Sequence, residues 1–500
     1  MKILYMPLDE RPCNYKFPNM NLINNKDIEL IKIPKNYMGN FKKSANIDKI
    51  YEWLENNLYK CDAAVISLEM LIYGGLIPSR IHKISSYILL NRLNNFAKLV
   101  EKVKETKHID IYIFALIMRT PAYSSSEEEP NYYAEYGELI FKRAYLINKS
   151  ETYSLSKNEL EELHYANQKI PNYVIKDYES RRLINIDIIK NCLPLLKNNL
   201  IDYLVIPQDD SSKFGYGIKE KKEIFSNIKK ENIENKVLTY PGADEVGSAL
   251  ICRSIVKNII NKPKISIFFD REEAMSLIPK YEGMELKKSI KHQIQVSNAI
   301  FTKEINEADI ILFVHTREGE MQDSWKQEPY EYNDKNYLNL LNLNKPFIIC
   351  DIAFANGSDL SFVNKIFDKK ISNNLLSYAA WNTAGNTIGT AISSGIIQFL
   401  FGSEKSKEKL LFYRIADDYA YQSIVRKKYN NLLEGIAKNT YIHIDNNDLE
   451  LRNKIKNDLM IELNNLYKKS PYEIEDIIFP WSRLFEVDIK IGENKDAKLL

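Results

Sequence analysis

The chain has 500 residues, of which 45% are hydrophobic and 27% charged, and its formal net charge at pH 7 is +2. This length predicts two or three domains, and the composition is that of a globular protein. The small net charge excludes a strongly basic or acidic surface of the kind that recruits nucleic acid or a membrane, so neither is expected as a partner.

The cysteine pattern and the N-terminal stretch both predict a cytoplasmic protein. The five cysteines form no CxxC motif, and their number is odd, which favours reduced thiols over disulfides. The start MKILYMPLDERPC lacks the apolar stretch of a signal peptide, and the sequence has no run of about 18 apolar residues.

The first 262 residues alternate short apolar runs with helical patterns, which predicts an N-terminal α/β domain with parallel strands. The predicted strands are 2–7, 28–33, 63–68, 111–118, 202–206 and 236–240, and the predicted helices include 47–59, 86–105 and 219–230. A mostly helical insertion is expected at about 120–200, as a lid or a dimer contact. A barrel-like (β/α) domain and a doubly wound parallel sheet both fit this pattern.

A second series of apolar runs begins after Pro263 and predicts a smaller, flavodoxin-like α/β domain over 263–402. Its predicted strands are 264–269, 298–302, 310–315 and 346–351, with a further short strand near 375–380. The remainder, 403–500, is predicted to be mostly helical until the stretch FPWSRLFEVDIKIG at 479–492.

Polar residues follow one predicted strand after another. Ligands of parallel α/β folds bind at the carboxyl ends of the strands, so these residues are candidates for one substrate pocket. Each residue taken alone also fits a helix cap. The candidates are Asp9, Glu10, Arg11, Asn14, Glu69, Tyr73, Arg80, Arg119, Gln208, Asp209, Asp210, Asp244 and Glu245 in the first domain, and Asp351 and Asn356 in the second.

The adjacent pair Asp209 and Asp210 is the sharpest of these signals. Two carboxyl groups a few ångströms apart do not ionise together easily, so one pKa is expected to rise while the other stays low. Such a pair suits general acid catalysis, with the second carboxylate orienting the substrate. The alternative is a helix cap with a salt bridge, and Asp244 with Glu245 is a rival acid pair.

The stretch AAWNTAGNTIGT at 379–390 contains a second group of candidate binding residues. Trp381 is expected to offer a flat apolar face to a sugar ring, and Asn382 and Asn386 open a helix whose free N–H groups bind anions or hydroxyls. A plain N-cap is the alternative. Among the six histidines only His315 ends a predicted strand, where a hydrogen-bonded core histidine is the commoner role. No HExxH, P-loop, GxGxxG or GxSxG motif occurs.

Eight blocks of the chain together resemble one bacterial family, known as the domain of unknown function DUF4127. They are YMPLDERPCN, ISLEMLIYGGLIPSR, IMRTPAY, DYLVIPQDDSSKFGYG, PGADEVGSALICR, CDIAFANGSD, AAWNTAGNTIGT and FPWSRLFEV. The resemblance extends from residue 5 to about residue 487. It implies a shared architecture and brings no catalytic residues with it.

The acid pair at a strand end also resembles the Asp-Asp or Asp-Glu pairs of barrel-fold N-acetylhexosaminidases. We therefore expect a hydrolase, foremost a glycoside hydrolase acting on a small glycan or an N-acetylated amino sugar. Asp209 or Asp210 would be the general acid, and no cofactor is expected. Two alternatives stay open, namely a hydrolase whose carboxylates bind Mg²⁺ or Mn²⁺ and a non-catalytic sugar- or metabolite-binding protein. A homodimer is also open.

Overall fold

The computed structural model describes residues 1–23, 25–209, 212–368, 373–433, 442–467, 470 and 472–494. The chain divides into two compact units. Unit 1 comprises Met1–Glu10, Lys26–Leu250 and Tyr281–Gly283, and unit 2 comprises Arg11–Asn25, Ile251–Lys280 and Met284–Leu500.

Unit 1 is built on a six-stranded sheet in the order β2-β1-β3-β4-β5-β6, in which every pairing is parallel. The strands are β1 (Lys2–Met6), β2 (Glu29–Lys32), β3 (Ala63–Ser67), β4 (Asp110–Phe114), β5 (Tyr203–Val205) and β6 (Val237–Leu238). Each lies within a predicted range or starts one residue before it. Since β2 and β6 do not pair among the described residues, the sheet is open and has the doubly wound form rather than that of a closed barrel.

The helices of unit 1 also follow the predicted ranges. The three predicted helices are α3 (Ile47–Asn57) with η1 (Leu58–Lys60), α5 (Ser86–Thr106) and α9 (Tyr216–Glu231). The unit also contains the π-helical turn η2 (Glu69–Tyr73), α4 (Leu76–Ile81) and η3 (Glu234–Lys236), and α10 (Val246–Val256) begins in unit 1 and ends in unit 2. Asn46 caps α3 by accepting a hydrogen bond from the backbone N–H of Lys49, and Asn232 ends α9 in the left-handed conformation.

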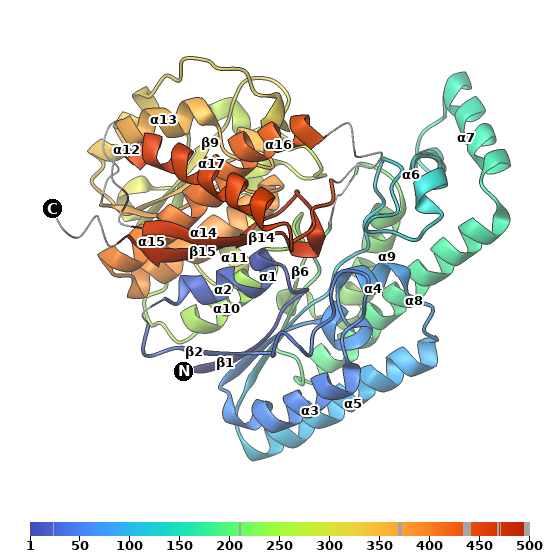
Figure 1. The fold of residues 1–500 in the computed structure, drawn as a ribbon. Helices are drawn as coiled ribbons and strands as arrows, with labels where there is room; N and C mark the ends of the chain where they lie inside the picture. The colour runs from blue at the N-terminus through green and yellow to red at the C-terminus, as the bar shows by residue number, and fades with distance from the viewer. Residues whose placement is uncertain are drawn as a thin grey trace. The chain divides into compact units, whose positions relative to one another are not determined.

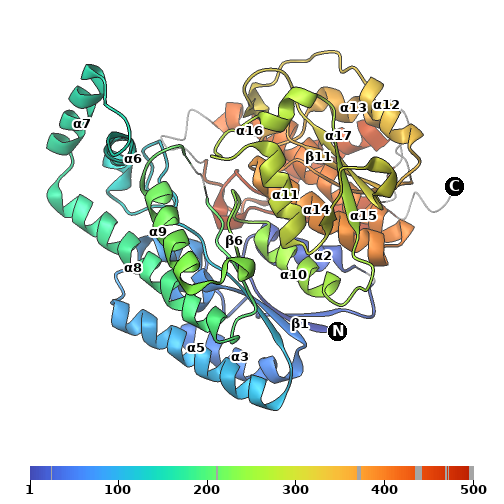
Figure 2. The same ribbon diagram turned by 180° about the vertical axis from the view of Figure 1, so that it is seen from behind.

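The predicted insertion after β4 is helical, as the sequence indicates. It consists of α6 (Tyr133–Ser150), α7 (Lys157–Lys169) and α8 (Asn172–Lys197). Helices α6 and α7 project away from the sheet in both views (Figures 1 and 2). A small apolar cluster holds the insertion together and includes Met118, Tyr133, Ile170 and Tyr178.

Unit 2 contains a five-stranded sheet in the order β13-β11-β9-β7-β8, again parallel throughout. The strands are β7 (Lys264–Phe269), β8 (Ile300–Phe301), β9 (Ile310–His315), β11 (Phe347–Asp351) and β13 (Leu375–Ala379). Numbered along the chain, this order is 2-1-3-4-5, the flavodoxin-like arrangement of doubly wound folds. The short strands β10 (Gln322–Asp323) and β12 (Phe354–Ala355) pair separately.

Helices cover both faces of the sheet in unit 2. Successive side chains of a strand point to opposite faces, so two neighbouring residues of β11 show which helices pack on each face. Ile348 faces α14 (Ala384–Phe401), where a methyl group added at Gly395 would meet the Ile348 side chain at 2.3 Å. The next residue, Ile349, belongs instead to the core cluster that contains Tyr337 and Phe362. These two lie on α12 (Lys335–Asn342) and α13 (Leu360–Asp368).

The rest of unit 2 is largely helical and ends in an antiparallel hairpin. Its elements are α1 (Pro12–Tyr15), α2 (Phe17–Asn21), η4 (Glu272–Ser276), α11 (Leu286–Val296), η5 (Ile305–Glu307), η6 (Ser324–Lys326), α15 (Glu404–Arg414), the π-helix η7 (Ile415–Val425), α16 (Arg426–Leu433), α17 (Leu449–Tyr467), β14 (Tyr472–Ile478), η8 (Pro480–Ser482) and β15 (Asp488–Glu493). The sequence analysis did not predict the hairpin β14–β15.

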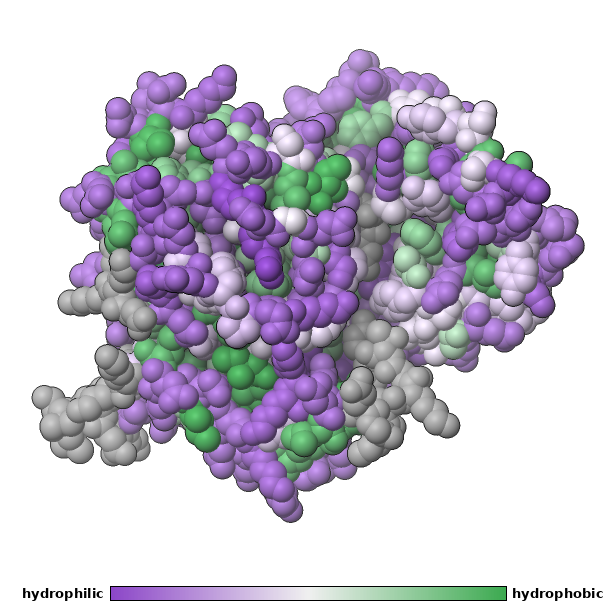
Figure 3. Space-filling view, turned by 90° about the horizontal axis from the view of Figure 1, so that it is seen from above, coloured by the Kyte–Doolittle hydropathy of each residue, from purple (hydrophilic) through white to green (hydrophobic). Residues whose placement is uncertain are grey.

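Among the described residues, no helix combines the length and the apolar character that a membrane crossing requires. The face of the molecule seen in Figure 3 is mostly hydrophilic, and its apolar side chains occur in small scattered groups, as is normal for a globular surface.

Candidate functional site

Ligands of open parallel α/β sheets bind outside the carboxyl ends of the strands. The chain leaves β3 directly into η2, whose first residue is Glu69. Beyond β4 and β5, the backbone of Gln208 bridges Ile117 on one side and Pro241 on the other. The segments that follow β3, β4 and β5 therefore emerge at one edge of the sheet.

Glu69 is a buried carboxyl group with few hydrogen-bond partners. Its residue is 4% exposed, Oε2 accepts a hydrogen bond from the Ser67 hydroxyl at 3.0 Å, and Oε1 accepts one from the backbone N–H of Leu116 at 2.7 Å. Burial raises the pKa of Glu69 to about 7, because these hydrogen bonds and the charge of Arg80 only partly offset the lost hydration. Glu69 is thus poised to exchange a proton near neutral pH.

Two buried arginines, Arg80 and Arg119, bind the carboxylates around Glu69. Arg80 approaches Glu128 at 3.1 Å, Glu129 at 3.7 Å and Asp209 at 2.6 Å. Arg119 approaches the same Glu128 at 2.9 Å and Glu129 at 3.0 Å. Each glutamate therefore bridges both guanidinium groups, and the segments after β3, β4 and β5 are tied together through charge-assisted hydrogen bonds.

We predict that Arg80→Met lowers the free energy of unfolding of unit 1 by about 3–5 kcal/mol, because it leaves buried carboxylates without their cation. Urea unfolding followed by circular dichroism measures the loss. The matched control is Lys142→Met, which removes an exposed ion pair to Glu162 and is expected to cost no more than about 1 kcal/mol. Equal effects of the two substitutions would contradict the network.

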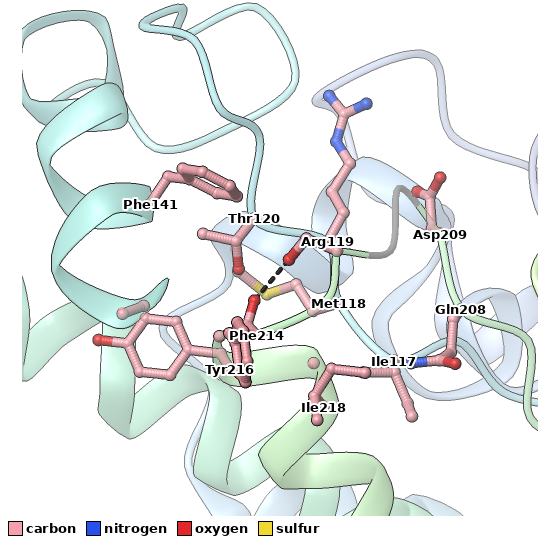
Figure 4. Close-up of a pocket in the computed structure, with 14 residues that line it drawn as sticks. Ile117, Met118, Arg119, Thr120, Phe141, Gln208, Asp209, Phe214, Tyr216 and Ile218 are labelled. Carbon is pink, nitrogen blue, oxygen red and sulfur yellow. Dashed lines mark hydrogen bonds between the residues drawn. The ribbon is translucent and has the colours of Figure 1, made fainter. Parts of the chain in front are cut away.

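Two adjoining cavities open beside this network, and both are lined by Ile117, Met118, Arg119 and Asp209. The acid cavity is lined in addition by Leu68, Glu69, Tyr73, Leu76, Ser79, Arg80, Leu116, Asn185 and Ile189. The aromatic cavity is lined in addition by Thr120, Phe141, Ala144, Gln208, Ser212, Phe214, Gly215, Tyr216, Gly217 and Ile218 (Figure 4). Asp209 and Arg119 thus stand where the two cavities meet.

Tyr73 contributes an unsatisfied hydroxyl group to the acid cavity. The residue is 3% exposed, and its hydroxyl has no hydrogen-bond partner among the described residues. Because an unpaired buried hydroxyl costs free energy, a ligand oxygen or a water molecule is its natural partner. The turn ends at Gly74, whose φ of 84° and whose close approach to Ser44 and Ala45 both require glycine.

The structure describes the two predicted acid pairs to different extents. Asp209 is held by Arg80, while Asp210 lies outside the described residues, so the expected pairing of the two is not described. Asp244 and Glu245 are buried after β6, and Glu245 accepts a hydrogen bond from the backbone N–H of Ala243 at 2.9 Å. Neither of the latter two lines the acid cavity or the aromatic cavity.

Three more predicted residues belong to unit 1. Asp9 is 2% exposed and follows β1. Glu10 accepts a hydrogen bond from the backbone N–H of Phe41 at 2.9 Å, and Gln208 accepts one from the Lys221 ammonium group at 2.7 Å. Of these three, only Gln208 lines one of the two cavities.

The remaining predicted residues belong to unit 2. Arg11 forms an ion pair with Glu486 at 2.9 Å, and Asn14 is fully buried. Trp381 lies in the apolar core, with 6% of its surface exposed. The other three are Asn356 and Asn382, which have positive φ values of 62° and 67°, and Asn386, whose side chain donates to the Thr383 hydroxyl at 3.2 Å.

Asp351 is part of a buried ionic cluster at the carboxyl ends of β7, β9 and β11. At its centre is His315, whose Nδ1 lies 2.6 Å from Asp270 and whose Nε2 lies 3.0 Å from Asp359. Although burial by itself lowers the pKa of a histidine, hydrogen bonds to these two carboxylates raise the pKa of His315 to about 10. The ring is therefore an imidazolium with both N–H groups engaged, the core role that its sequence position favours.

Asp351 accepts hydrogen bonds from the backbone N–H of Asp359 at 2.8 Å and from the Tyr378 hydroxyl at 2.7 Å. Burial raises the pKa of Asp351. Asp359 also accepts a hydrogen bond from the Tyr330 hydroxyl at 2.5 Å. This cluster therefore joins three strand ends of unit 2, and its polar side chains form hydrogen bonds with one another.

Glu128 and Glu129 are the site residues that the sequence did not single out. They belong to the run EEEP, which is typical of an acidic turn. The sequence signal that could have identified them is the short distance along the chain between this run and Arg119. Among the described side chains, no group of three or more histidine, cysteine, aspartate or glutamate residues has the geometry of a metal site.

The model of the family described as "Protein of unknown function (DUF4127)" matches residues 3–490. None of the curated proteins compared with the chain matches it.

Proposed function

We propose that this chain, which belongs to the DUF4127 family, is a glycoside hydrolase that works at the acid cavity of unit 1. Glu69 is the general acid and Asp209 is the second carboxylate. The observation that carries the proposal is that a carboxyl group with a pKa of about 7 and an arginine-bound carboxylate line the same cavity. Two carboxyl groups in contrasting environments are the usual equipment for hydrolysis of a glycosidic bond.

The contrast between the two environments assigns the roles. Glu69 is enclosed and carries a proton for part of the time at neutral pH, so it protonates the leaving oxygen. Asp209 has a side chain that is 17% exposed and forms an ion pair with Arg80 at 2.6 Å. An anion in that position stabilises the positive charge that develops on the sugar ring, or activates a water molecule.

The other side chains of the acid cavity suit a hydroxylated substrate. The Tyr73 hydroxyl and the Arg80 guanidinium group are hydrogen-bond donors, and Asn185 and Ser79 add polar atoms to the lining. Because the Tyr73 hydroxyl has no partner among the described residues, a sugar hydroxyl would satisfy it on binding. Trp381, which was expected to offer a flat apolar face to the sugar ring, is buried in the core of unit 2 and does not line this cavity.

A panel of 4-nitrophenyl glycosides, with and without an N-acetyl group, tests the proposal. We expect at least one to be hydrolysed, and Asp209→Asn to lower kcat by about 10²–10⁴-fold, because the neutral amide supplies neither the charge nor the base. The matched control is Asp48→Asn, at an exposed aspartate in the first turn of α3, and it should retain the wild-type rate.

Two outcomes would overturn the proposal. The first is that folded wild-type protein hydrolyses no glycoside of the panel. The second is that Asp209→Asn, with an unchanged circular dichroism spectrum, keeps the wild-type kcat. Binding of a glycoside without turnover would favour the alternative of a sugar-binding protein.

A further inference from the structure

We infer that the acid cavity is a binding site for one water molecule, held between the Tyr73 hydroxyl and the Glu69 carboxyl group, and that Tyr73 acts through this water as a positioning residue for Glu69. The inference rests on the proposed function for the role of Glu69, whereas the water site itself does not depend on that role. Both residues line the cavity, and they are the first and last residues of the π-helical turn η2. Such turns occur frequently at functional sites.

The size of the acid cavity fits a single oxygen atom. Its free volume is about 10 Å³, which is the lower limit for one water molecule and leaves no room for a second. A sugar ring is far larger than this space, so a substrate reaches into it with one hydroxyl group, which takes the place of the water. The occupant in the free protein is therefore one water molecule.

Two of the polar groups that line the cavity have the capacity for a further hydrogen bond. The Ser79 hydroxyl and the Asn185 side-chain N–H group already donate to backbone carbonyls, at 2.6 Å and 2.9 Å. Glu69 accepts one hydrogen bond at each of its carboxyl oxygens, and each oxygen has a second lone pair. The Tyr73 hydroxyl has no partner among the described residues. A water molecule that accepts from Tyr73 and donates to Glu69 satisfies both groups.

Tyr73 is suited to be the donor in this arrangement. Burial and the charge of Glu69 both raise the pKa of Tyr73 well above its usual value, so the hydroxyl keeps its proton. The ring packs against His82 with the two centroids 4.9 Å apart, and the Ser44 hydroxyl donates to the Tyr73 carbonyl at 2.9 Å. These contacts hold the ring whether or not the hydroxyl is present, so Tyr73→Phe removes a hydrogen bond and keeps the packing.

The water changes the acidity of Glu69 in a defined direction. A hydrogen bond donated to a carboxylate stabilises the charged form and therefore lowers the pKa. Burial and the charge of Glu69 raise the pKa of the Cys192 thiol on α8 to about 12, so this neighbour stays neutral. The charged and titratable groups that face Glu69 include Tyr73, Arg80, Arg119, Cys192 and Asp209. Removal of the Tyr73 hydroxyl deprives the water of one of its two partners, and the pKa of Glu69 is then expected to rise.

Crystal structures of the wild-type protein and of Tyr73→Phe, at a resolution that shows ordered water, test the site without reference to turnover. We expect one water molecule within hydrogen-bond distance of both the Tyr73 hydroxyl and a Glu69 carboxyl oxygen in the wild type, and none at that place in the variant. A wild-type cavity without this ordered water, or a water molecule that stays in place in the variant, overturns the inference.

The pH dependence of kcat/KM tests the positioning role, because this quantity reports the ionisation of the free enzyme. The limb that falls with rising pH is expected to lie about one pH unit higher in Tyr73→Phe than in the wild type, since the carboxylate loses a hydrogen bond. A merely structural role would lower the rate and leave the limb in place. The matched control is Tyr87→Phe, at a tyrosine of α5 that is 74% exposed, and it should move neither the rate nor the limb.

A direct titration of the Glu69 carboxyl group separates this inference from the hydrolase proposal. Carbon-13 NMR of protein labelled at the glutamate carboxyl carbons follows the titration, and the Glu69 resonance is identified by its absence from Glu69→Gln. A higher pKa in Tyr73→Phe, in a protein that hydrolyses no glycoside, keeps the water site and removes the enzyme. Hydrolysis of glycosides by a protein in which Tyr73→Phe moves neither the titration nor the kcat/KM limb overturns the role of Tyr73 and keeps the enzyme.

Discussion

Glu69→Gln is expected to lower the hydrolysis of glycosides that have a poor leaving group by about 10²–10⁴-fold, because the amide has no proton of suitable acidity to donate. The same variant should hydrolyse 2,4-dinitrophenyl glycosides at close to the wild-type rate, since that leaving group departs without protonation. A comparison of kcat for phenyl and 2,4-dinitrophenyl glycosides of the same sugar measures the difference. A structural role of Glu69 would lower both rates alike.

The pH dependence of the wild-type protein supplies a second readout for the same residue. Glu69 donates a proton only in its protonated form, and burial raises its pKa to about 7. The rate is therefore expected to fall as the pH rises through about 7, and the Glu69→Gln variant should lack this limb of the profile. The matched control is Glu105→Gln, at an exposed residue of α5, which should preserve both the rate and the profile.

His315→Leu is expected to lower the free energy of unfolding of unit 2 by about 3–5 kcal/mol, because it leaves buried carboxylates without their cation. Asp270 and Asp359 contact the ring, Asp351 lies beside Asp359, and all are at most 8% exposed. Three of the four tryptophans of the chain, at positions 325, 381 and 481, belong to unit 2, so urea unfolding followed by tryptophan fluorescence reports mainly on this unit.

The pH dependence of this contribution follows from the direction of the shift. The pKa of His315 is raised from 6.5 to about 10 in the folded protein. A raised pKa means that the folded state binds the proton more tightly, so the stabilisation is complete below about pH 6.5 and is lost as the pH rises toward 10. The facing groups include Asp270, Asp359, Asp351, Tyr330 and Tyr332, and burial raises the pKa of both tyrosines, which keeps them neutral over that window.

Two further variants keep this prediction decisive. Tyr330→Phe removes one hydrogen bond to the Asp359 carboxylate and should cost about 1.5–3 kcal/mol without removing the histidine, so it serves where His315→Leu does not fold. His164→Leu, at an exposed histidine of α7, is the matched control and should leave the unfolding midpoint unchanged. A His315→Leu variant as stable as wild type at pH 6 would show that the cluster contributes nothing.

The alternation of apolar runs and helical patterns predicted most strands of both sheets. The run KISIFF at 264–269 coincides with β7, and the run IILFVH at 310–315 coincides with β9. These strands are buried, so continuous hydrophobicity marks them. The hairpin β14–β15 was harder to recognise, because its exposed and buried residues alternate irregularly and its partners are joined by a long connection.

The residue types of the candidate site were predicted, and the structure shows which of the described ones line one cavity. Glu69, Tyr73, Arg80, Arg119 and Asp209 were expected at strand ends, and the structure brings these five to the lining of one cavity. The adjacency of Asp209 to Asp210 pointed to the second of these as the partner acid. Asp210 lies outside the described residues, and among those described Glu69, 140 residues earlier in the chain, is the other carboxyl group that lines the same cavity as Asp209.

The sequence by itself determined that the chain alternates strands and helices, that polar residues follow the strands, and that a helical insertion interrupts the first series. These features are local, because hydrophobic periodicity and strand-end composition are written in neighbouring residues. Only the tertiary structure decided that the first sheet is open, that Glu128 and Glu129 bridge two arginines, and that burial raises the pKa of Glu69. Strand order, burial and charge pairing depend on residues far apart in the chain, and no local pattern records which of them meet.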